Sequence, residues 1–165
     1  MKKWSYWIFP TLVMGVIFYS SSQPYQEQDI KPLLSNYIDL TFLQPYLEWI
    51  SFTYHQSEVS VETHGVHGLI EFFIRKGAHV TVFLLLFVAF YVAYKHTLKK
   101  SVKRVLFISL FSTVAYAISD ELHQGITPNR TPYIGDVFLD SFGALIGLGL
   151  ILLFRRRKAI NGPYT

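Results

Sequence analysis

Charged and hydrogen-bonding residues gather at the ends of three apolar stretches of this 165-residue chain. Beside a lipid bilayer every ionisable group is costly to place, so such a gathering indicates a functional site. Basic side chains there could bind an anion, and histidines next to carboxylates could move a proton. The residues are Arg75, Lys76 and His79 in the first group, Asp120, Glu121, His123 and Gln124 in the second, and Arg130, Asp136 and Asp140 in the third.

Helical spacing places these residues on shared faces, because side chains three or four positions apart lie on the same side of a helix. The pairs with this spacing are Lys76 with His79, Asp120 with His123, and Asp136 with Asp140. Gly143 and Gly147 continue the face of Asp140, and small residues four apart allow close helix packing. We therefore predict that three helix ends point at one polar pocket, which Arg130 closes from a connecting loop.

Such a pocket could bind an anionic head group, and a lipid phosphate would be the natural anion at a membrane surface. The predicted anion ligands are Arg75, Lys76 and Arg130. A histidine oriented by Asp120 could also transfer a proton, and the candidates are His79 and His123. A purely structural alternative stays open, in which the acidic and basic groups pair with one another and lock the helix ends.

Metal catalysis is a further alternative, since histidine and carboxylate side chains ligate zinc and harder divalent ions. The weak candidates for ligands are His79, His123, Asp120 and Asp136. The sequence contains no His-Glu-x-x-His motif or comparable spacing. We therefore predict no metal and no cofactor.

Composition places the chain in a membrane. Hydrophobic residues make up 51% of it, aromatic residues 17% and charged residues 16%, which is too apolar for an ordinary soluble domain. There is no cysteine, so disulfide frameworks and thiolate metal sites are excluded. The net charge of +4 does not indicate nucleic-acid binding, because the basic residues form no patch among aromatics on a soluble surface.

Four apolar stretches are long enough to cross a hydrocarbon core, which needs about 20 helical residues. They run over residues 4–22, 77–94, 105–124 and 134–154. The fold class predicted is therefore all-α, a polytopic membrane protein with four transmembrane helices. The first stretch resembles a secretory signal, but its aromatic ends and the lack of an Ala-x-Ala-like site favour an uncleaved helix, which Pro10 should kink.

Charge orients this predicted bundle. Eleven basic residues fall at the amino end, in the second loop and in the tail, none of which holds an acid: Lys2, Lys3, Lys95, Lys99, Lys100, Lys103, Arg104, Arg155, Arg156, Arg157 and Lys158. By the positive-inside rule, both termini are cytoplasmic. All eleven acidic residues then lie on the outward side. The predicted polar pocket would therefore face the outside of the cell membrane.

The long outer loop, residues 23–76, has an apolar pattern near helical spacing, which predicts short interfacial helices. A lid over the bundle and a lipid-binding surface fit this pattern equally well. The polar stretch from Glu58 to Gly65 is expected to loop outward, and a helix is expected from Val66 to Arg75. Glu71 and Arg75, four apart, would form a surface pair on it.

Several of these segments together resemble the VanZ family of small bacterial membrane proteins. They are Ser21-Ser22-Gln23, Arg75-Lys76-Gly77-Ala78-His79, Ser119-Asp120-Glu121-Leu122-His123-Gln124 with Pro128 and Arg130, Asp136-Val137, and Gly143-Ala144-x-x-Gly147. The resemblance covers most of the chain apart from the long loop. It implies a single VanZ-like membrane domain over residues 1–165 and adds Gln23 to the pocket formed by Glu121, Gln124, Asp136 and Asp140. Where the family often has asparagine, this chain has Asp140.

The resemblance also implies a protein of the bacterial cell envelope, because the family takes its name from a member linked to glycopeptide resistance, chiefly to teicoplanin. We expect the pocket to bind an anionic amphiphile, such as a lipid-linked wall component or a lipoglycopeptide. The expected partners are membrane lipids and no nucleic acid. The alternative is a membrane-embedded hydrolase or transferase that acts on lipid phosphates through an Asp/His site. A proton-coupled transporter is disfavoured, because the inner halves of the stretches lack carboxylates.

Overall fold

Three long helices form the body of the protein. The computed structural model describes residues 3–160; Lys2 and the side chain of Lys158, both counted above as basic, lie outside what it describes. The helices are α4 (Val61–Thr97), α5 (Val102–Gln124) and α6 (Ile134–Ile160), and all three are long and apolar enough to cross a membrane. The predicted multi-pass, mainly helical architecture is thus confirmed for the last three of the four stretches.

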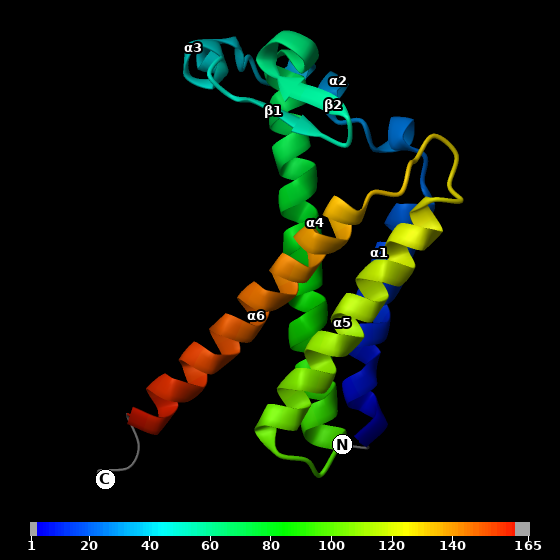
Figure 1. The fold of residues 1–165 in the computed structure, drawn as a ribbon, viewed down its shortest axis with the longest axis vertical. Helices are drawn as coiled ribbons and strands as arrows, with labels where there is room; N and C mark the ends of the chain where they lie inside the picture. The colour runs from blue at the N-terminus through cyan, green and yellow to red at the C-terminus, as the bar shows by residue number, and fades with distance from the viewer. Residues whose placement is uncertain (1–2, 161–165) are drawn as a thin grey trace.

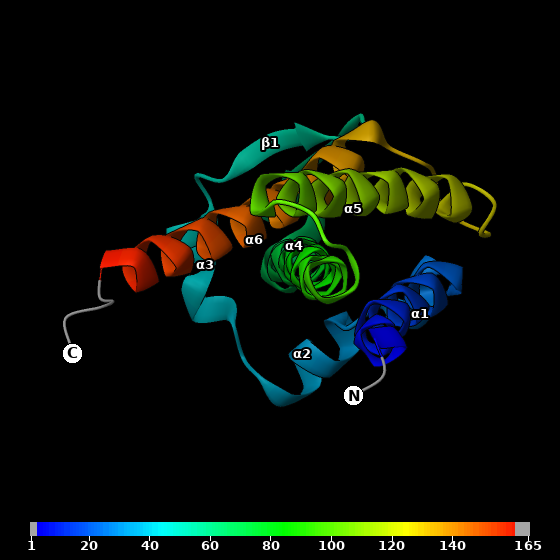
Figure 2. The same ribbon diagram turned by 90° about the horizontal axis from the view of Figure 1, so that it is seen from below.

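The other helices surround α4, which runs through the centre of the bundle (Figures 1 and 2). Its side chains Phe83, Leu86 and Phe87 are fully buried among those of α1 (Ile8–Ser22), α5 and α6. One end of the molecule holds the start of α1, the end of α6 and the connection between α4 and α5 (Figure 1). This end carries the basic segments, and we call it the basic end; the opposite end is the polar end.

The helix α1 contains 15 residues and is not among the three helices long and apolar enough to cross a membrane, so the fourth predicted span is not shown. It follows a 3₁₀ helix, η1 (Lys3–Trp7), and Pro10 lies in its first turn. A proline there removes no helical hydrogen bond, because the first turn of an α-helix has no acceptors for its N–H groups. The expected kink in the middle of this segment is therefore replaced by a change from 3₁₀ to α geometry before the proline.

Two glycines let α6 cross α4 at close range. A β-carbon at Gly143 would overlap the backbone carbonyl oxygen of Val80, and one at Gly147 would lie 2.9 Å from Cδ1 of Phe87. Away from this crossing, α6 diverges from α4 toward the basic end (Figure 1). The predicted close contact through these glycines is confirmed, and it is made with α4.

The segment between α1 and α4 contains the short helices that its apolar pattern predicts. They are η2 (Tyr25–Gln28), α2 (Lys31–Tyr37), η3 (Thr41–Leu43) and α3 (Gln44–Leu47). Large side chains of this segment are strongly exposed, including Tyr37, Phe42, Tyr46 and Trp49. Aromatic residues with such exposure are typical of membrane–water interfaces.

An antiparallel hairpin, β1 (Ser51–Tyr54) and β2 (Ser57–Ser60), departs from the all-α prediction. Its two turn residues, His55 and Gln56, both have positive φ, which suits the twist of a two-residue hairpin. The expected loop from Glu58 to Gly65 is wrong for the same reason, since β2 runs directly into α4. Phe52 and Tyr54 alternate with polar residues, and this strand signal is weak because the turn lacks the usual Asn-Gly sequence.

The central helix begins five residues earlier than the expected start at Val66. Ser60 caps it, because the Ser60 hydroxyl accepts a bond from the N–H of Thr63 and the Thr63 hydroxyl accepts one from the N–H of Ser60. Gly65 then interrupts the helical geometry with φ +67°, a conformation that glycine adopts without strain. Below this break the helix continues to Thr97 and carries the first group of polar residues.

Candidate functional site

Lys76 and Asp136 form an ion pair where α4 meets the start of α6. The Lys76 ammonium lies 2.5 Å from the Asp136 carboxylate. The hydroxyl of Tyr54, from the hairpin, donates to the same carboxylate oxygen, and Lys76 lies 4.5 Å from the centre of the Tyr54 ring. Burial, and then the hydrogen bond to Asp136, raises the pKa of Tyr54 well above its usual range. The phenol therefore stays protonated and holds the hairpin against the ion pair.

His79 faces Asp140, about one helical turn along α4 and α6 from the Lys76–Asp136 pair. Nδ1 of His79 lies 3.3 Å from the Asp140 carboxylate, which is almost fully buried. A buried carboxylate beside an imidazole fixes the orientation of the ring. The sequence predicted that Asp120 would orient one of the two histidines, whereas the structure places the Asp140 carboxylate beside His79.

Arg130 connects the α5–α6 loop to the end of α1 and to η2. Its guanidinium donates to the side-chain oxygens of Gln124 and Gln28, each at 2.7 Å. It also reaches the backbone oxygens of Gln23 at 3.1 Å and Ser20 at 3.4 Å. All four of these acceptors are uncharged, so no carboxylate of the described residues is hydrogen-bonded to the guanidinium.

Burial, and then the positive charge of Arg75, lowers the pKa of Arg130. The two guanidinium groups thus act on each other. Arg75 donates to the Glu71 carboxylate and to the backbone oxygen of Gln28, each at 2.9 Å. The predicted Glu71–Arg75 pair is therefore confirmed, but Glu71 is buried and not at the surface.

The polar residues at the end of α5 make two kinds of contact, hydrogen bonds and ring stacking. Asp120 accepts a bond from the Gln124 side chain at 2.9 Å, and Glu121 accepts one from the backbone N–H of Tyr133. His123 instead stacks on Phe18 of α1, with ring centres 4.3 Å apart. The second group is thus split, because Asp120 and Glu121 accept hydrogen bonds whereas the His123 ring packs against α1.

Three buried polar atoms of α5 have no hydrogen-bond partner among the described residues. They are Oδ1 of Asp120, Oε2 of Glu121 and Nδ1 of His123. A buried carboxylate oxygen without a partner is costly, unless it carries a proton or meets a water or ligand. These three atoms could therefore form further hydrogen bonds, for example to a water molecule or a ligand.

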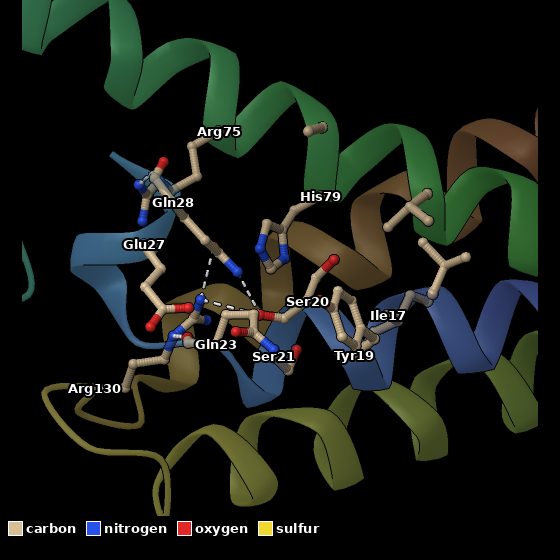
Figure 3. Close-up of a pocket in the computed structure, with 13 residues that line it drawn as sticks. Ile17, Tyr19, Ser20, Ser21, Gln23, Glu27, Gln28, Arg75, His79 and Arg130 are labelled. Carbon is tan, nitrogen blue, oxygen red and sulfur yellow. Dashed lines mark hydrogen bonds between the residues drawn. The ribbon is translucent and has the colours of Figure 1, made fainter. Parts of the chain in front are cut away.

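A cavity of about 550 Å³ lies between α1 and α4. Figure 3 shows Arg75 and Arg130 approaching its polar end from opposite sides, with Gln28 between them. Its opposite part is apolar. The lining residues are Val16, Ile17, Tyr19, Ser20, Ser21, Gln23, Glu27, Gln28, Arg75, Ala78, His79, Val82 and Arg130. The cavity thus combines a positively charged end with an apolar wall.

A second cavity of about 290 Å³ lies under the hairpin. It contains the Lys76–Asp136 pair and shares three residues, Arg75, His79 and Arg130, with the cavity between α1 and α4. These three side chains therefore stand between the two cavities. Of the residues predicted for the polar pocket, seven line one or both cavities: Gln23, Arg75, Lys76, His79, Gln124, Arg130 and Asp136. Asp120, Glu121, His123 and Asp140 line neither of them.

The structure adds residues that spacing did not identify. Tyr54, Gln28 and Ser20 bind the predicted side chains directly. They come from segments far away in the sequence, and no periodicity links them to α4 or α6. Within the described residues, no group of three or more histidine, cysteine, aspartate or glutamate side chains is placed to hold a metal ion.

The comparisons with known proteins agree with the motifs. A family model described as VanZ/LLP1 matches residues 6–155, which includes every residue of the two cavities. No curated protein and no solved structure matches the chain.

Proposed function

The chain belongs to the VanZ/LLP1 family of membrane proteins, and on this premise we propose that it binds an anionic amphiphile in the cavity between α1 and α4. The observation that carries the proposal is the cavity itself, about 550 Å³ with two arginines at one end and apolar side chains at the other. An amphiphile with a charged head and an acyl or prenyl tail has the same distribution of polarity.

The arginines supply the head-group contacts in this proposal. Arginine offers a fork of donors that matches phosphate and carboxylate oxygens. The four oxygens that accept hydrogen bonds from Arg130 are neutral, so an anion would add a charge-assisted contact without displacing a carboxylate from them. Lys76, the third predicted anion ligand, contributes from the neighbouring cavity, where Asp136 partly neutralises it.

The apolar wall supplies the tail contacts. Val16 and Ile17 of α1 face Val82 and Ala78 of α4 along the cavity. Both helices belong to the apolar body of the protein, so a ligand tail there continues directly into the surrounding lipid. This arrangement favours a ligand that arrives from the bilayer over one that arrives from water.

The topology we propose has four crossings with both termini in the cytoplasm. The 15 residues of α1 span about 22 Å and the five residues of η1 about 10 Å, which together match a hydrocarbon core of about 30 Å. The positive-inside rule places the basic end in the cytoplasm. The cavity between α1 and α4 would then open at the outer leaflet, as part of one domain.

At that leaflet the ligand class we favour is a lipid-linked wall component or a lipoglycopeptide. Such ligands join an anionic group to a long apolar chain, as the cavity requires. Binding of this kind would give the protein a role in the cell envelope, including a contribution to resistance against teicoplanin or related glycopeptides.

The His79–Asp140 pair supports a second candidate function. A histidine held by a buried carboxylate can act as a general acid or base, and His79 lines both cavities next to Arg75 and Arg130. In this alternative the protein is a hydrolase or transferase that acts on the phosphate of the bound lipid. A His79→Gln variant would then bind ligand normally but lose turnover, whereas a pure binding protein would show no turnover in either form.

Photocrosslinking tests the binding proposal. The purified full chain is titrated in detergent with a photoreactive prenyl phosphate, and labelled peptides of α1 and α4 are quantified by mass spectrometry. Arg130→Gln should weaken the apparent affinity at these peptides about tenfold to a hundredfold, because bonds to a charged group contribute about 1.5–3 kcal/mol.

Lys31→Gln is the matched control, since it removes a basic residue from the segment between α1 and α4 without touching the cavity. It should change the affinity by less than about twofold. Labelling of α1 and α4 that is equal in wild type and Arg130→Gln would contradict the proposal. Equal labelling by a neutral prenyl alcohol would contradict it as well, because the arginines would then not distinguish a charged ligand from a neutral one.

A further inference from the structure

The basic end of the bundle holds its own cavity, separate from the site described above. It has a volume of about 310 Å³ and lies between α4 and α6. Its lining residues are Tyr91, Lys95, Ile151, Phe154 and Arg155. We infer that this cavity binds the phosphate head group of an anionic glycerophospholipid from the adjacent leaflet.

The polar lining is a cluster of two cations around one phenol. Arg155 donates to the hydroxyl of Tyr91 at 3.4 Å, and the Lys95 ammonium lies 5.9 Å from the centre of the Tyr91 ring. The Tyr91 side chain is only 7% exposed, so its position is fixed by the surrounding helices. Its hydroxyl accepts the bond from Arg155 and keeps its own hydrogen for a phosphate oxygen.

The charge around this cavity is uncompensated within the chain. The sequence has no aspartate or glutamate between residues 72 and 119, and none after residue 140. Lys95 and Arg155 are both exposed, and four further basic residues lie in the α4–α5 region from Lys99 to Arg104. Basic pockets between membrane helices commonly take lipid head groups. No acidic side chain of these segments competes for Lys95 and Arg155, so a lipid phosphate can pair with both.

The shape of the helix pair explains why the ligand is a lipid and not a free anion. Close contact at Gly143 and Gly147 fixes the crossing of α4 and α6, and α6 then diverges toward the basic end (Figure 1). Ile151 and Phe154 line the space that opens, and Phe154 is 66% exposed. Acyl chains fill such a space beneath the head group, whereas inorganic phosphate would leave these side chains uncovered.

The experiment uses the full chain in detergent and a photoreactive phosphatidylglycerol with its label on the acyl chain. Labelled peptides are mapped, because labelling of residues 91–95 and 151–155 separates this site from the one between α1 and α4. The double variant Lys95→Gln/Arg155→Gln should weaken the apparent affinity at these peptides about thirtyfold, because it removes both cations that line the cavity and would make charge-assisted contacts with the phosphate. Tyr91→Phe, which preserves packing and charge, should weaken it about threefold to tenfold.

The matched control is Lys99→Gln/Arg156→Gln, which removes the same charge from the same end without altering the cavity lining. It should change the affinity by less than about threefold. A loss in the control equal to that in the Lys95/Arg155 variant would overturn the inference, as would equal labelling by phosphatidylcholine. Displacement of the lipid by millimolar inorganic phosphate would show a free-anion site and would overturn the choice of a lipid.

Discussion

The two ends of this bundle treat charge in opposite ways. At the polar end, cations and acids pair within the protein: Lys76 with Asp136, Arg75 with Glu71, and His79 with Asp140. At the basic end the sequence supplies cations and no acid at all. Internal pairing fixes the position of each group, which suits selective recognition, whereas unpaired cations depend on counterions from their surroundings. The crossing of α4 and α6 separates these two regimes.

The largest effect is expected from breaking that crossing. Gly143→Leu would drive a side chain into the α4 backbone at Val80, and we expect it to lower the free energy of unfolding by about 3 kcal/mol. Gly149→Leu is the control on the same helix, because nothing lies within 4 Å of a β-carbon there. Thermal unfolding in detergent compares the two variants. Equal destabilisation would show that the crossing does not separate the ends.

Removing a charge at the polar end should lower the free energy of unfolding more than removing one at the basic end. Lys76→Met leaves Asp136 without its cation in a partly buried place, and we expect a loss of about 1–2 kcal/mol in unfolding free energy. Lys99→Met should cost less than about 0.5 kcal/mol. A double-mutant cycle with Asp136→Asn isolates the pair, and a coupling energy near zero would remove the distinction between fixed and free charges.

Glu27 offers a way to make the polar end more like the basic end. Its exposed carboxylate lines the cavity between α1 and α4, where it opposes the field of the two arginines. Glu27→Gln should strengthen binding of the prenyl phosphate about twofold to fivefold, in keeping with the weak effect of exposed charges. Glu62→Gln, in the first turn of α4, should leave the affinity unchanged. Weaker binding by Glu27→Gln would mean that the carboxylate serves the ligand.

Lowering the pH should reduce thermal stability through the acidic side chains of the polar end, and this is the smallest expected effect. The backbone N–H of Lys31 holds the pKa of Asp29 below its ordinary value of about 3.9. The stabilisation is present above that ordinary value and is lost as pH falls through the lower folded value. The difference in melting temperature between wild type and Asp29→Asn should therefore shrink below pH of about 4. For Lys99→Gln the difference should stay constant over this range.

Sequence patterns located the elements whose signal is local. The three long helices follow from apolar length, and the Glu71–Arg75 pair follows from a spacing of four. The crossing through Gly143 was also predictable, since small residues on one face need a close neighbour. The identity of the helix that α6 contacts there could not be predicted, because it depends on the packing of the whole bundle.

The site could be assembled from sequence only in part. Lys76, Asp136, His79 and Asp140 were each identified, but their actual pairing joins positions 60 or more residues apart. Tyr54 was missed because it arrives on a hairpin whose turn lacks a recognisable signal. Long-range contacts of this kind are set by how loops return to the bundle, and no period of 2 or 3.6 residues encodes them.

The length of α4 sets the position of the hairpin relative to the start of α6. From Val66 to Thr97 the helix continues without the break seen at Gly65, and each residue adds about 1.5 Å of height and about 100° of rotation. Glu71, Arg75 and Lys76 lie on this rod below the hairpin that it supports. One residue inserted between Val66 and Glu71 would turn the hairpin by about 100° and swing Tyr54 away from Asp136. The number of residues in this part of α4 therefore decides which residues of the hairpin contact the site.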